Sequence, residues 1–328
     1  MTNISLWNNL DTQKRKYHNG GQKKNDRESE AYVMDIRFEK REHLKEKPDQ
    51  KHLGFGKYMT DYMFVMDWTK EEGWKDARIV PEGPITMDPA CVTLHYAQET
   101  FEGMKAYRTA EGKIQLFRPE MNAKRMINSN ARLCMPELPV DMFVEAVKAL
   151  VKVEEDWVPS EPETSLYIRP FMFATEAALG VHMASAYKFM IICCPVGAYY
   201  AEGINPVKIL VEDELVRAVK GGTGFTKCGG NYAGSILGQV KAEKMGYSQV
   251  LWLDGEHRKY VEEVGTMNIM FKIAGEIYTA PIEGTVLPGV TRDSMIHLLR
   301  DWGYKVNETR LSVDDLMKAG HDGTLEEV

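Results

Sequence analysis

The sequence lacks both the cysteine pattern of a disulfide-bonded protein and any long hydrophobic run. Its five cysteines are odd in number and scattered over 328 residues, and two of them, Cys193 and Cys194, are adjacent in an apolar run. Such usage is typical of a reducing compartment. No apolar stretch approaches the ~20 residues that span a bilayer, and the N-terminus has no apolar signal-peptide core. We therefore expect a cytoplasmic protein with no membrane partner.

Features typical of nucleic-acid-binding proteins, metalloproteins and serine hydrolases are also absent. The net charge is −7, which argues against nucleic-acid binding, and the basic cluster at 14–24 is more simply a solvated tail. Eight histidines are dispersed without HExxH spacing, and no paired Cys-x-x-Cys occurs, so no metal site is expected. The sequence has no G-x-S-x-G elbow of a serine hydrolase.

The length and the distribution of polar residues predict two domains. Single cores stop growing near ~250–300 residues, and this chain has 328. Residues 1–52 are dense in charge and predict a poorly ordered leader, with structure beginning near Phe55. We expect a small α+β domain at 53–196, a connection with two turn clusters at 197–206, and a large domain at 207–328.

Hydrophobic spacing predicts a mixed sequence of helices and strands. Apolar residues recur at roughly helical spacing after Val140, and Pro119 suits a first helical turn. Ser312 is expected to cap a last short helix. Helices are predicted over 119–134, 140–157, 232–244 and 291–302, and strands over 187–194, 207–211, 249–253 and 267–273.

The most unusual segment is KGGTGFTKCGGNY, residues 220–232. Five glycines surround Lys227, so the backbone can approach a ligand closely. The segment is not a P-loop, because Thr226 precedes the lysine and Cys228 follows it. A lysine in a confined pocket can lose its proton and form a Schiff base with a carbonyl. A mobile surface loop with a solvated lysine is the equal alternative from this segment alone.

Two further segments have both a ligand-binding and an ordinary interpretation. In VLPGVTRDSMIHLL (286–299), the residues around Thr291 open a probable helix, whose free N–H groups attract an anion such as phosphate. An ordinary helix cap is the more probable explanation of that segment in isolation. In VEEVGTMN (261–268), one of two carboxylates could hold a positively charged ring nitrogen, and the alternative is a pair of exposed acids on an edge strand.

Six segments together carry a resemblance to a known family. Three are those just described, and the others are LHYAQETFEGMKAYR (94–108), LFRPEMNAKRM (116–126) and SLYIRPFMFATE (165–176). In this order and at these spacings they resemble the branched-chain amino-acid aminotransferases, from about Leu44 onward. The resemblance implies the two-domain α/β and α+β fold of the fold-type IV enzymes, with pyridoxal 5'-phosphate as cofactor.

The resemblance also implies a role for each matching residue. Lys227 corresponds to the lysine that forms the Schiff base with the cofactor, and Glu263 to the carboxylate that pairs with its ring nitrogen. The other cofactor contacts would be Arg125, Tyr232, Thr266, Leu287, Val290 and Thr291. The substrate side would be formed by Tyr96, Phe101, Tyr167, Arg169, Leu179 and Val181. The last two match a loop that reaches into the neighbouring subunit's site, so a homodimer is implied.

The activity implied is ping-pong amino-group transfer from leucine, isoleucine and valine to 2-oxoglutarate, with Lys227 moving the Cα proton. Two alternatives stay open. One is another fold-type IV enzyme, such as a D-amino-acid transaminase. The other is a truncated homologue that binds cofactor but is catalytically impaired, because the family continues past Val328 into a Gly-Thr-Ala loop that contacts substrate and cofactor. On that hypothesis the large domain is incomplete and substrate is bound poorly.

Overall fold

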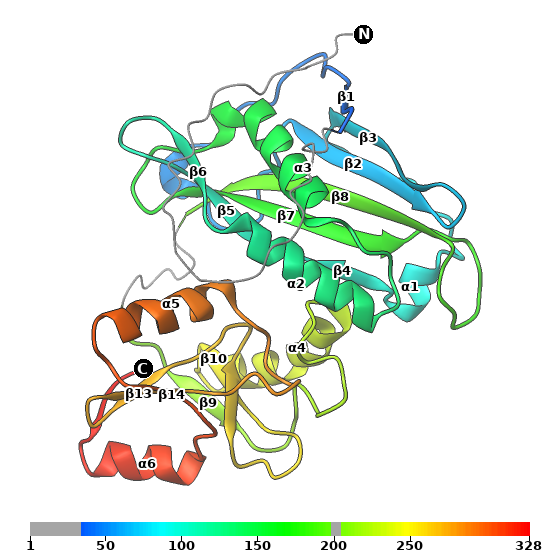
Figure 1. Cartoon of the computed structure of the whole chain (residues 1–328). Helices are drawn as coiled ribbons and strands as arrows, with labels where there is room; N and C mark the ends of the chain where they lie inside the picture. The colour runs from blue at the N-terminus through cyan, green and yellow to red at the C-terminus, as the bar shows by residue number, and fades with distance from the viewer. Residues whose placement is uncertain (1–33, 198–204) are drawn as a thin grey trace, which may run out of the picture.

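A large mixed sheet with two helices on one face forms the N-terminal region of the computed structural model, which describes residues 34–197 and 205–328. The strand order is β1-β3-β2-β8-β7-β5-β6, and β4 pairs beside β7 (Figure 1). The strands are β1 (Arg37–Phe38), β2 (Tyr62–Thr69), β3 (Gly73–Pro81), β4 (Glu99–Phe101), β5 (Met104–Arg108), β6 (Ile114–Leu116), β7 (Ser165–Ala174) and β8 (Ala186–Val196).

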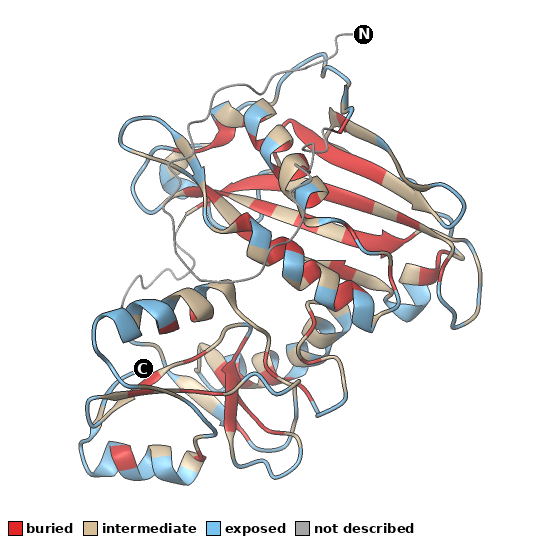
Figure 2. Ribbon diagram, in the orientation of Figure 1, coloured by how far each residue is buried: buried red, intermediate tan, exposed pale blue. Residues whose placement is uncertain are grey.

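Helices α2 (Pro119–Arg132) and α3 (Val140–Val153) cover this sheet, while α1 (Val92–Tyr96) lies at its edge (Figure 1). The apolar stripe of α3 includes Phe143 and Leu150, both fully buried, and it packs against sheet residues such as Phe189. Figure 2 shows the same pattern, with buried residues concentrated on the central strands and the inner sides of both helices. Two short 3₁₀ turns, η1 (Gln50–His52) and η2 (Glu155–Trp157), flank the region.

Regular structure begins earlier in the chain than the composition suggested. Met34 is buried, β1 pairs with β3, and the ring of Phe38 lies 5.2 Å from that of Tyr62. The backbone N–H of Arg41 donates to the hydroxyl of Tyr62 at 3.1 Å. These contacts with distant residues are invisible to a local count of charge, so order starts before Phe55. Residues 1–33, most of the expected leader, lie outside the described part of the chain.

The C-terminal region contains two smaller sheets with three helices around them. One sheet has the order β11-β10-β9 and the other β14-β13-β12-β15. The strands are β9 (Ile209–Glu212), β10 (Gln249–Leu253), β11 (Val261–Val264), β12 (Phe271–Ile273), β13 (Glu276–Thr279), β14 (Val306–Glu308) and β15 (Leu325–Glu327). The helices are α4 (Gly229–Lys244), α5 (Val290–Asp301) and α6 (Val313–His321).

The predicted mixed α/β architecture is confirmed, with adjustments at element ends. Helix α3 stops at Val153 and passes into η2, short of Trp157, and the strand expected over 267–273 is reduced to β12. Ser312 caps α6 as predicted, because its hydroxyl accepts the N–H of Asp315 at 3.0 Å. Most of the connection expected at 197–206 lies outside the described residues. Within the described ranges, no helix is long and apolar enough to cross a membrane.

Candidate active site

Lys227 lies in the loop just before α4 and is held by both regions of the chain. Its backbone N–H donates to Ser129 Oγ at 2.9 Å, and its carbonyl accepts the N–H of Phe101 at 2.9 Å. Its amine lies 2.7 Å from the hydroxyl of Tyr232 and 4.5 Å from the ring centre of Phe101. Strand β4, helix α2 and helix α4 therefore all fix this one side chain.

The surroundings of the Lys227 amine favour its neutral form. Burial lowers its pKa from 10.5 to about 8, and the guanidinium groups of Arg125 and Arg169 add to this effect, while Glu102 opposes it. At pH 7 a pKa of about 8 leaves roughly a tenth of the amine uncharged, several hundred times more than an ordinary lysine. An uncharged amine is the nucleophilic and basic form, so this lysine is prepared for carbonyl or proton chemistry.

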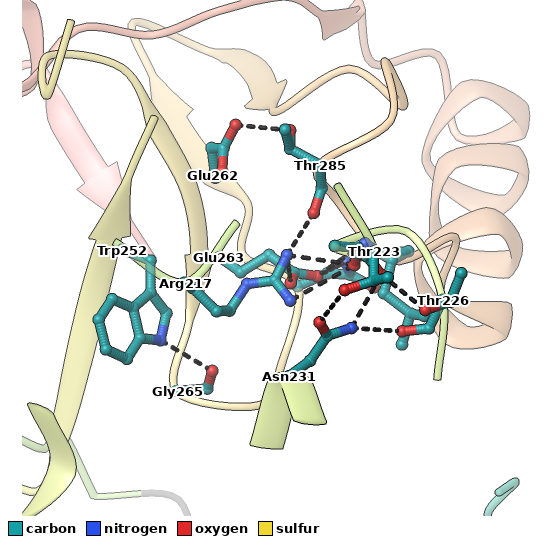
Figure 3. Close-up of polar contacts among 12 residues, drawn as sticks. Arg217, Thr223, Thr226, Asn231, Trp252, Glu262, Glu263, Gly265 and Thr285 are labelled. Carbon is teal, nitrogen blue, oxygen red and sulfur yellow. Dashed lines mark hydrogen bonds and ion pairs between the residues drawn. The ribbon is translucent and has the colours of Figure 1, made fainter. Parts of the chain in front are cut away.

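Glu263 on β11 is the second ionisable group of the site. It is 4% exposed, and its Oε2 lies 2.8 Å from the guanidinium of Arg217 (Figure 3). Its Oε1 accepts from Asn268 Nδ2 at 2.8 Å and from the backbone N–H of Leu287 at 3.2 Å. Burial raises the pKa of Glu263 to about 7, and Arg217 limits the rise. Small changes around this carboxylate therefore change its charge near neutral pH.

Arg217 is one residue of this site that sequence reasoning missed. Its guanidinium is 8% exposed, pairs with Glu263, and donates to the backbone carbonyl of Thr285 (Figure 3). No motif marks Arg217, which precedes Lys227 by ten positions. The only sequence signal is general: a buried carboxylate needs a cationic or hydrogen-bonding partner.

The two acids of β11 are not exposed edge-strand residues. Glu262 is 9% exposed and Glu263 is 4% exposed. Their side chains point to different neighbours, because Glu262 Oε1 accepts the hydroxyl of Thr285 at 2.6 Å, whereas Glu263 faces Arg217 (Figure 3). The alternative of an exposed acidic pair is therefore wrong.

A pocket beside Glu263 brings several predicted residues together with unpredicted ones. Its lining consists of Arg217, Thr226, Asn231, Tyr232, Ser235, Glu263, Gly265, Thr266 and Leu287. Val290 and Thr291 are the first residues of α5, as predicted, and Gly289 at the cap position supplies no side-chain acceptor for their N–H groups. This helix start keeps the capacity to bind an anion.

Arg125 approaches the same place from α2, and it is also committed to a buried partner. Its Nε and Nη2 both lie 2.8 Å from the carboxylate of Glu102, which is fully buried. Its Nη1 donates to the carbonyl of Pro288 at 3.2 Å, one residue before the cap of α5. Asn122 donates to Glu102 at 2.9 Å. Arg125 is therefore oriented toward the α5 start by a carboxylate that the sequence analysis did not single out.

The predicted substrate residues divide into two groups. Arg169 donates to the hydroxyl of Tyr167 at 2.8 Å and stacks 4.7 Å from the ring centre of Phe101, beside Lys227. In contrast, Tyr96, Leu179 and Val181 are exposed by 41%, 72% and 86%, respectively. The structure brings the first group to the lysine but leaves the second on the surface. Among the described residues, no cluster of His, Cys, Asp and Glu is placed to hold a metal ion.

Comparisons with known proteins agree with this site. The family model described as "Amino-transferase class IV" matches residues 99–321, which is more than half of the chain. The chain is 52% identical to "Branched-chain-amino-acid aminotransferase 2" of Bacillus subtilis (strain 168), over 89% of this chain and 80% of that protein. It is 53% identical to "Branched-chain-amino-acid transaminase 1" of the same organism, over 89% of this chain and 83% of that protein.

A solved structure supports the fold assignment. The branched-chain amino acid aminotransferase of Escherichia coli matches with a TM-score of 0.66 and 26% identity, over 78% of this chain and 79% of that chain. This chain belongs to the class IV aminotransferases, and within them to the branched-chain amino-acid aminotransferase family. The resemblance found in the sequence is thus confirmed, and the protein is an aminotransferase.

Proposed function

We propose that this enzyme transfers the amino group of L-leucine, L-isoleucine and L-valine to 2-oxoglutarate, with pyridoxal 5'-phosphate bound at Lys227. The observation that carries the proposal is the geometry of two buried groups: the Lys227 amine lies 2.7 Å from the hydroxyl of Tyr232, and the Glu263 carboxylate lies 2.8 Å from the guanidinium of Arg217. Burial lowers the pKa of the Lys227 amine to about 8 and raises the pKa of the Glu263 carboxyl to about 7. Two titratable groups at one site whose pKa values are both shifted toward neutral pH are typical of acid–base chemistry.

The residues present fit this cofactor. Lys227 offers an amine that is readily uncharged, and Glu263 offers a buried carboxylate to a ring nitrogen. Arg125 and the N–H groups of Val290 and Thr291 would hold the phosphate, with Thr266 and Leu287 lining the pocket. Pyridoxal 5'-phosphate, when bound, supplies an electron sink and a carrier for the amino group.

The chain's own residues would then move the Cα proton and supply a negative charge to the pocket. The uncharged amine of Lys227 would take the proton from the substrate Cα as a general base, and as a general acid it would deliver that proton to the cofactor carbon that receives the amino group. Tyr232, whose hydroxyl lies 2.7 Å from that amine, fixes its direction. Glu263, when ionised, would supply a negative charge to the pocket, and Arg217 favours that ionised form across 2.8 Å.

The substrate side combines apolar walls with one cation. Phe101 and Tyr167 present aromatic surface that suits a branched aliphatic side chain, and Arg169 adds a guanidinium stacked on Phe101. The same guanidinium provides a partner for the side-chain carboxylate of glutamate. These residues would therefore suit both a branched aliphatic side chain and the carboxylate of glutamate.

An amino-acid panel tests the proposal. Purified protein with pyridoxal 5'-phosphate and 2-oxoglutarate is given single amino acids, and glutamate is measured by mass spectrometry. We expect turnover of L-leucine, L-isoleucine and L-valine, with little turnover of L-aspartate or D-alanine. A faster reaction with D-alanine than with L-leucine would contradict the proposal and identify a D-amino-acid transaminase. Cofactor binding without turnover of any amino acid would identify the impaired homologue.

We also propose that the protein is a homodimer. Leu94, Tyr96, Leu179 and Val181 are exposed apolar side chains, and the segments that carry them are joined where the N–H of Val92 donates to Glu176 and Cys91 bridges to Ala177. Exposed apolar side chains on two joined segments are typical of an interface. Light scattering should give twice the 37.3 kDa chain mass, and replacing Leu179 and Val181 with glutamate should give monomers.

Two further assignments remain proposals. We propose a small domain that ends at 196 and begins near Met34, before the predicted start at 53, and a large domain at 207–328, which the separate apolar clusters of the two regions support. We also propose that the enzyme works in the cytoplasm, since the five cysteines are all free thiols. Limited proteolysis at the connection would test the domains, and thiol labelling in cells would test the compartment.

A further inference from the structure

The N-terminus of helix α4 is capped by a residue from a neighbouring strand, β4. The cap position, Cys228, makes no side-chain hydrogen bond to the helix. Instead the carboxylate of Glu99, the first residue of β4, accepts the backbone N–H of Gly229, the first residue of α4. The first N–H groups of a helix have no partner within the helix, so Glu99 satisfies one that the local sequence leaves open.

Only a glycine permits this contact. A Cβ built on Gly229 would overlap the Glu99 carboxylate, whereas a Cβ on Gly230 meets nothing within 4 Å. The two neighbouring glycines are therefore unequal, although they look alike in the sequence. Gly229 is needed for the close approach of the carboxylate, and Gly230 is not.

The capped residue stands between the two side chains that meet at the active site. Lys227 precedes Gly229 by two positions and Tyr232 follows it by three. Strand β4 holds the same stretch a second time, because the N–H of Phe101 donates to the carbonyl of Lys227 at 2.9 Å. The ring of Phe101 also lies 4.7 Å from that of Tyr232. Glu99 and Phe101 thus hold the backbone of this stretch from one short strand.

Charge adds to the hydrogen bond. An anion at a helix N-terminus is stabilised by the helix dipole. Burial raises the pKa of Glu99, while the N–H of Gly229 and the nearby Arg169 favour the ionised form. Arg169 lies on β7, and its positive charge lowers the pKa of Glu99. It belongs to the proposed substrate side.

We propose that Glu99 is a positioning residue, which caps α4 from the neighbouring strand and thereby fixes the Lys227 amine against the Tyr232 hydroxyl. The inference rests on the role proposed for Lys227. It is distinct from substrate binding, because the contact of Glu99 is with the protein backbone.

Four variants test the inference, with one matched control. Glu99→Ala removes the cap, Glu99→Gln keeps an acceptor oxygen but loses the charge, and Gly229→Ala displaces the carboxylate. Gly230→Ala is the control, since it adds the same methyl group to open space. The double variant Glu99→Ala, Gly229→Ala completes a double-mutant cycle. In it, Gly229→Ala should not lower kcat beyond the effect of Glu99→Ala, because the clashing carboxylate is gone.

The first readout does not need cofactor or activity. Hydrogen exchange of the Gly229 amide, followed by NMR in glycine-labelled protein, should speed up in Glu99→Ala and remain slow in the Gly230→Ala control. The second readout is steady-state kinetics. We expect kcat for leucine to fall about tenfold in Glu99→Ala and in Gly229→Ala, which is about 1.4 kcal/mol, with KM within about twofold. Glu99→Gln should recover most of kcat.

The outcomes separate the inference from the proposed function. A Glu99→Ala protein that melts at lower temperature but keeps its kcat would reduce Glu99 to a structural cap and overturn the inference. A hydrogen-exchange rate at the Gly229 amide that is the same in Glu99→Ala as in wild type would also overturn the inference. Wild-type protein without transaminase activity would instead refute the proposed function, and the exchange data would still decide whether Glu99 caps α4.

Discussion

Each region of the molecule contributes one buried arginine–glutamate pair to the site, and the two pairs are built differently. In the N-terminal region, both oxygens of Glu102 lie 2.8 Å from the fork of Arg125, and Asn122 adds a third donor. In the C-terminal region, Glu263 Oε2 lies 2.8 Å from Arg217 Nη2, and Glu263 Oε1 accepts from the neutral donors of Asn268 and Leu287.

The difference separates two roles for a buried pair. A bidentate pair fixes the geometry of both side chains. Burial raises the pKa of Glu263 to about 7, despite Arg217. The comparison predicts that the Glu102 pair acts on stability and that the Glu263 pair acts on turnover.

The largest effect should come from Lys227, whose amine feels the charges of Glu102, Arg125 and Glu263. Lys227→Ala should abolish transamination, because this side chain supplies the amine that holds the cofactor covalently and moves the Cα proton. Borohydride reduction followed by intact-mass measurement should show no covalent cofactor on the variant. Lys220→Ala replaces an exposed lysine of the same Gly-rich segment and is the control. It should retain both the mass of the covalently attached cofactor and the activity. Cofactor still attached to Lys227→Ala would refute the assignment.

Replacing Glu263 should reduce turnover strongly. Glu263→Gln should lower kcat about 10²- to 10³-fold, because an amide supplies no negative charge to the pocket, with little loss of cofactor binding. Glu262→Gln is the matched control, since its carboxylate faces Thr285 instead of the pocket (Figure 3). A larger loss in Glu262→Gln would transfer the role to that residue.

The opposite profile is expected for the other pair. Glu102→Gln leaves the charge of Arg125 buried without its partner, which typically costs about 3–5 kcal/mol of stability. Denaturant unfolding should show this loss. If instead Glu102→Gln were as stable as wild type and Glu263→Gln unfolded, the distinction between the two pairs would be wrong.

Arg217 should matter through the pKa of Glu263. An arginine favours the ionised carboxylate, so Arg217→Met raises the pKa of Glu263 above about 7 and leaves it protonated over a wider range. We expect kcat to fall about tenfold at pH 7 and to recover toward pH 9, so the acid limb of the pH profile moves upward. Arg217→Lys should shift it less. An unshifted limb in Arg217→Met would show that another group titrates there.

The sequence predicted the fold and the family, and it drew attention to Lys227 and Glu263, but it did not reveal the partners that surround them. The Gly-rich segment around Lys227 and the acids of β11 are local patterns, so their residues could be recognised from the chain alone. Arg217 and Glu99 act on residues that the fold brings close, and nothing in their own neighbourhood marks them. Spacing along the chain also could not show that Gly229 and Gly230 differ, because that depends on β4.

The smallest effect on turnover is expected for Glu154, a buried carboxylate that makes none of the contacts described for the site. Glu154 is 1% exposed, beside the N–H of Tyr62, and burial raises its pKa from 4.5 to about 7. A carboxyl whose folded-state pKa is raised stabilises the protein below its ordinary pKa, and this stability is lost as pH rises through about 7.

Wild-type protein should therefore lose unfolding free energy between pH 5 and pH 8, and part of that loss belongs to Glu154. We expect Glu154→Gln to remove on the order of 1–3 kcal/mol of this pH dependence, because an amide has no proton to lose. Glu155→Gln, the neighbouring and more exposed residue paired with Lys152, is the control and should keep the wild-type slope. The remaining slope in Glu154→Gln should decrease further when Glu263→Gln is added, since the pKa of Glu263 is also raised to about 7. Urea titrations at half-unit pH steps measure each slope. Equal slopes in wild type and Glu154→Gln would show that Glu154 stays ionised in the fold, and would leave Glu263 as the source of the acid stability.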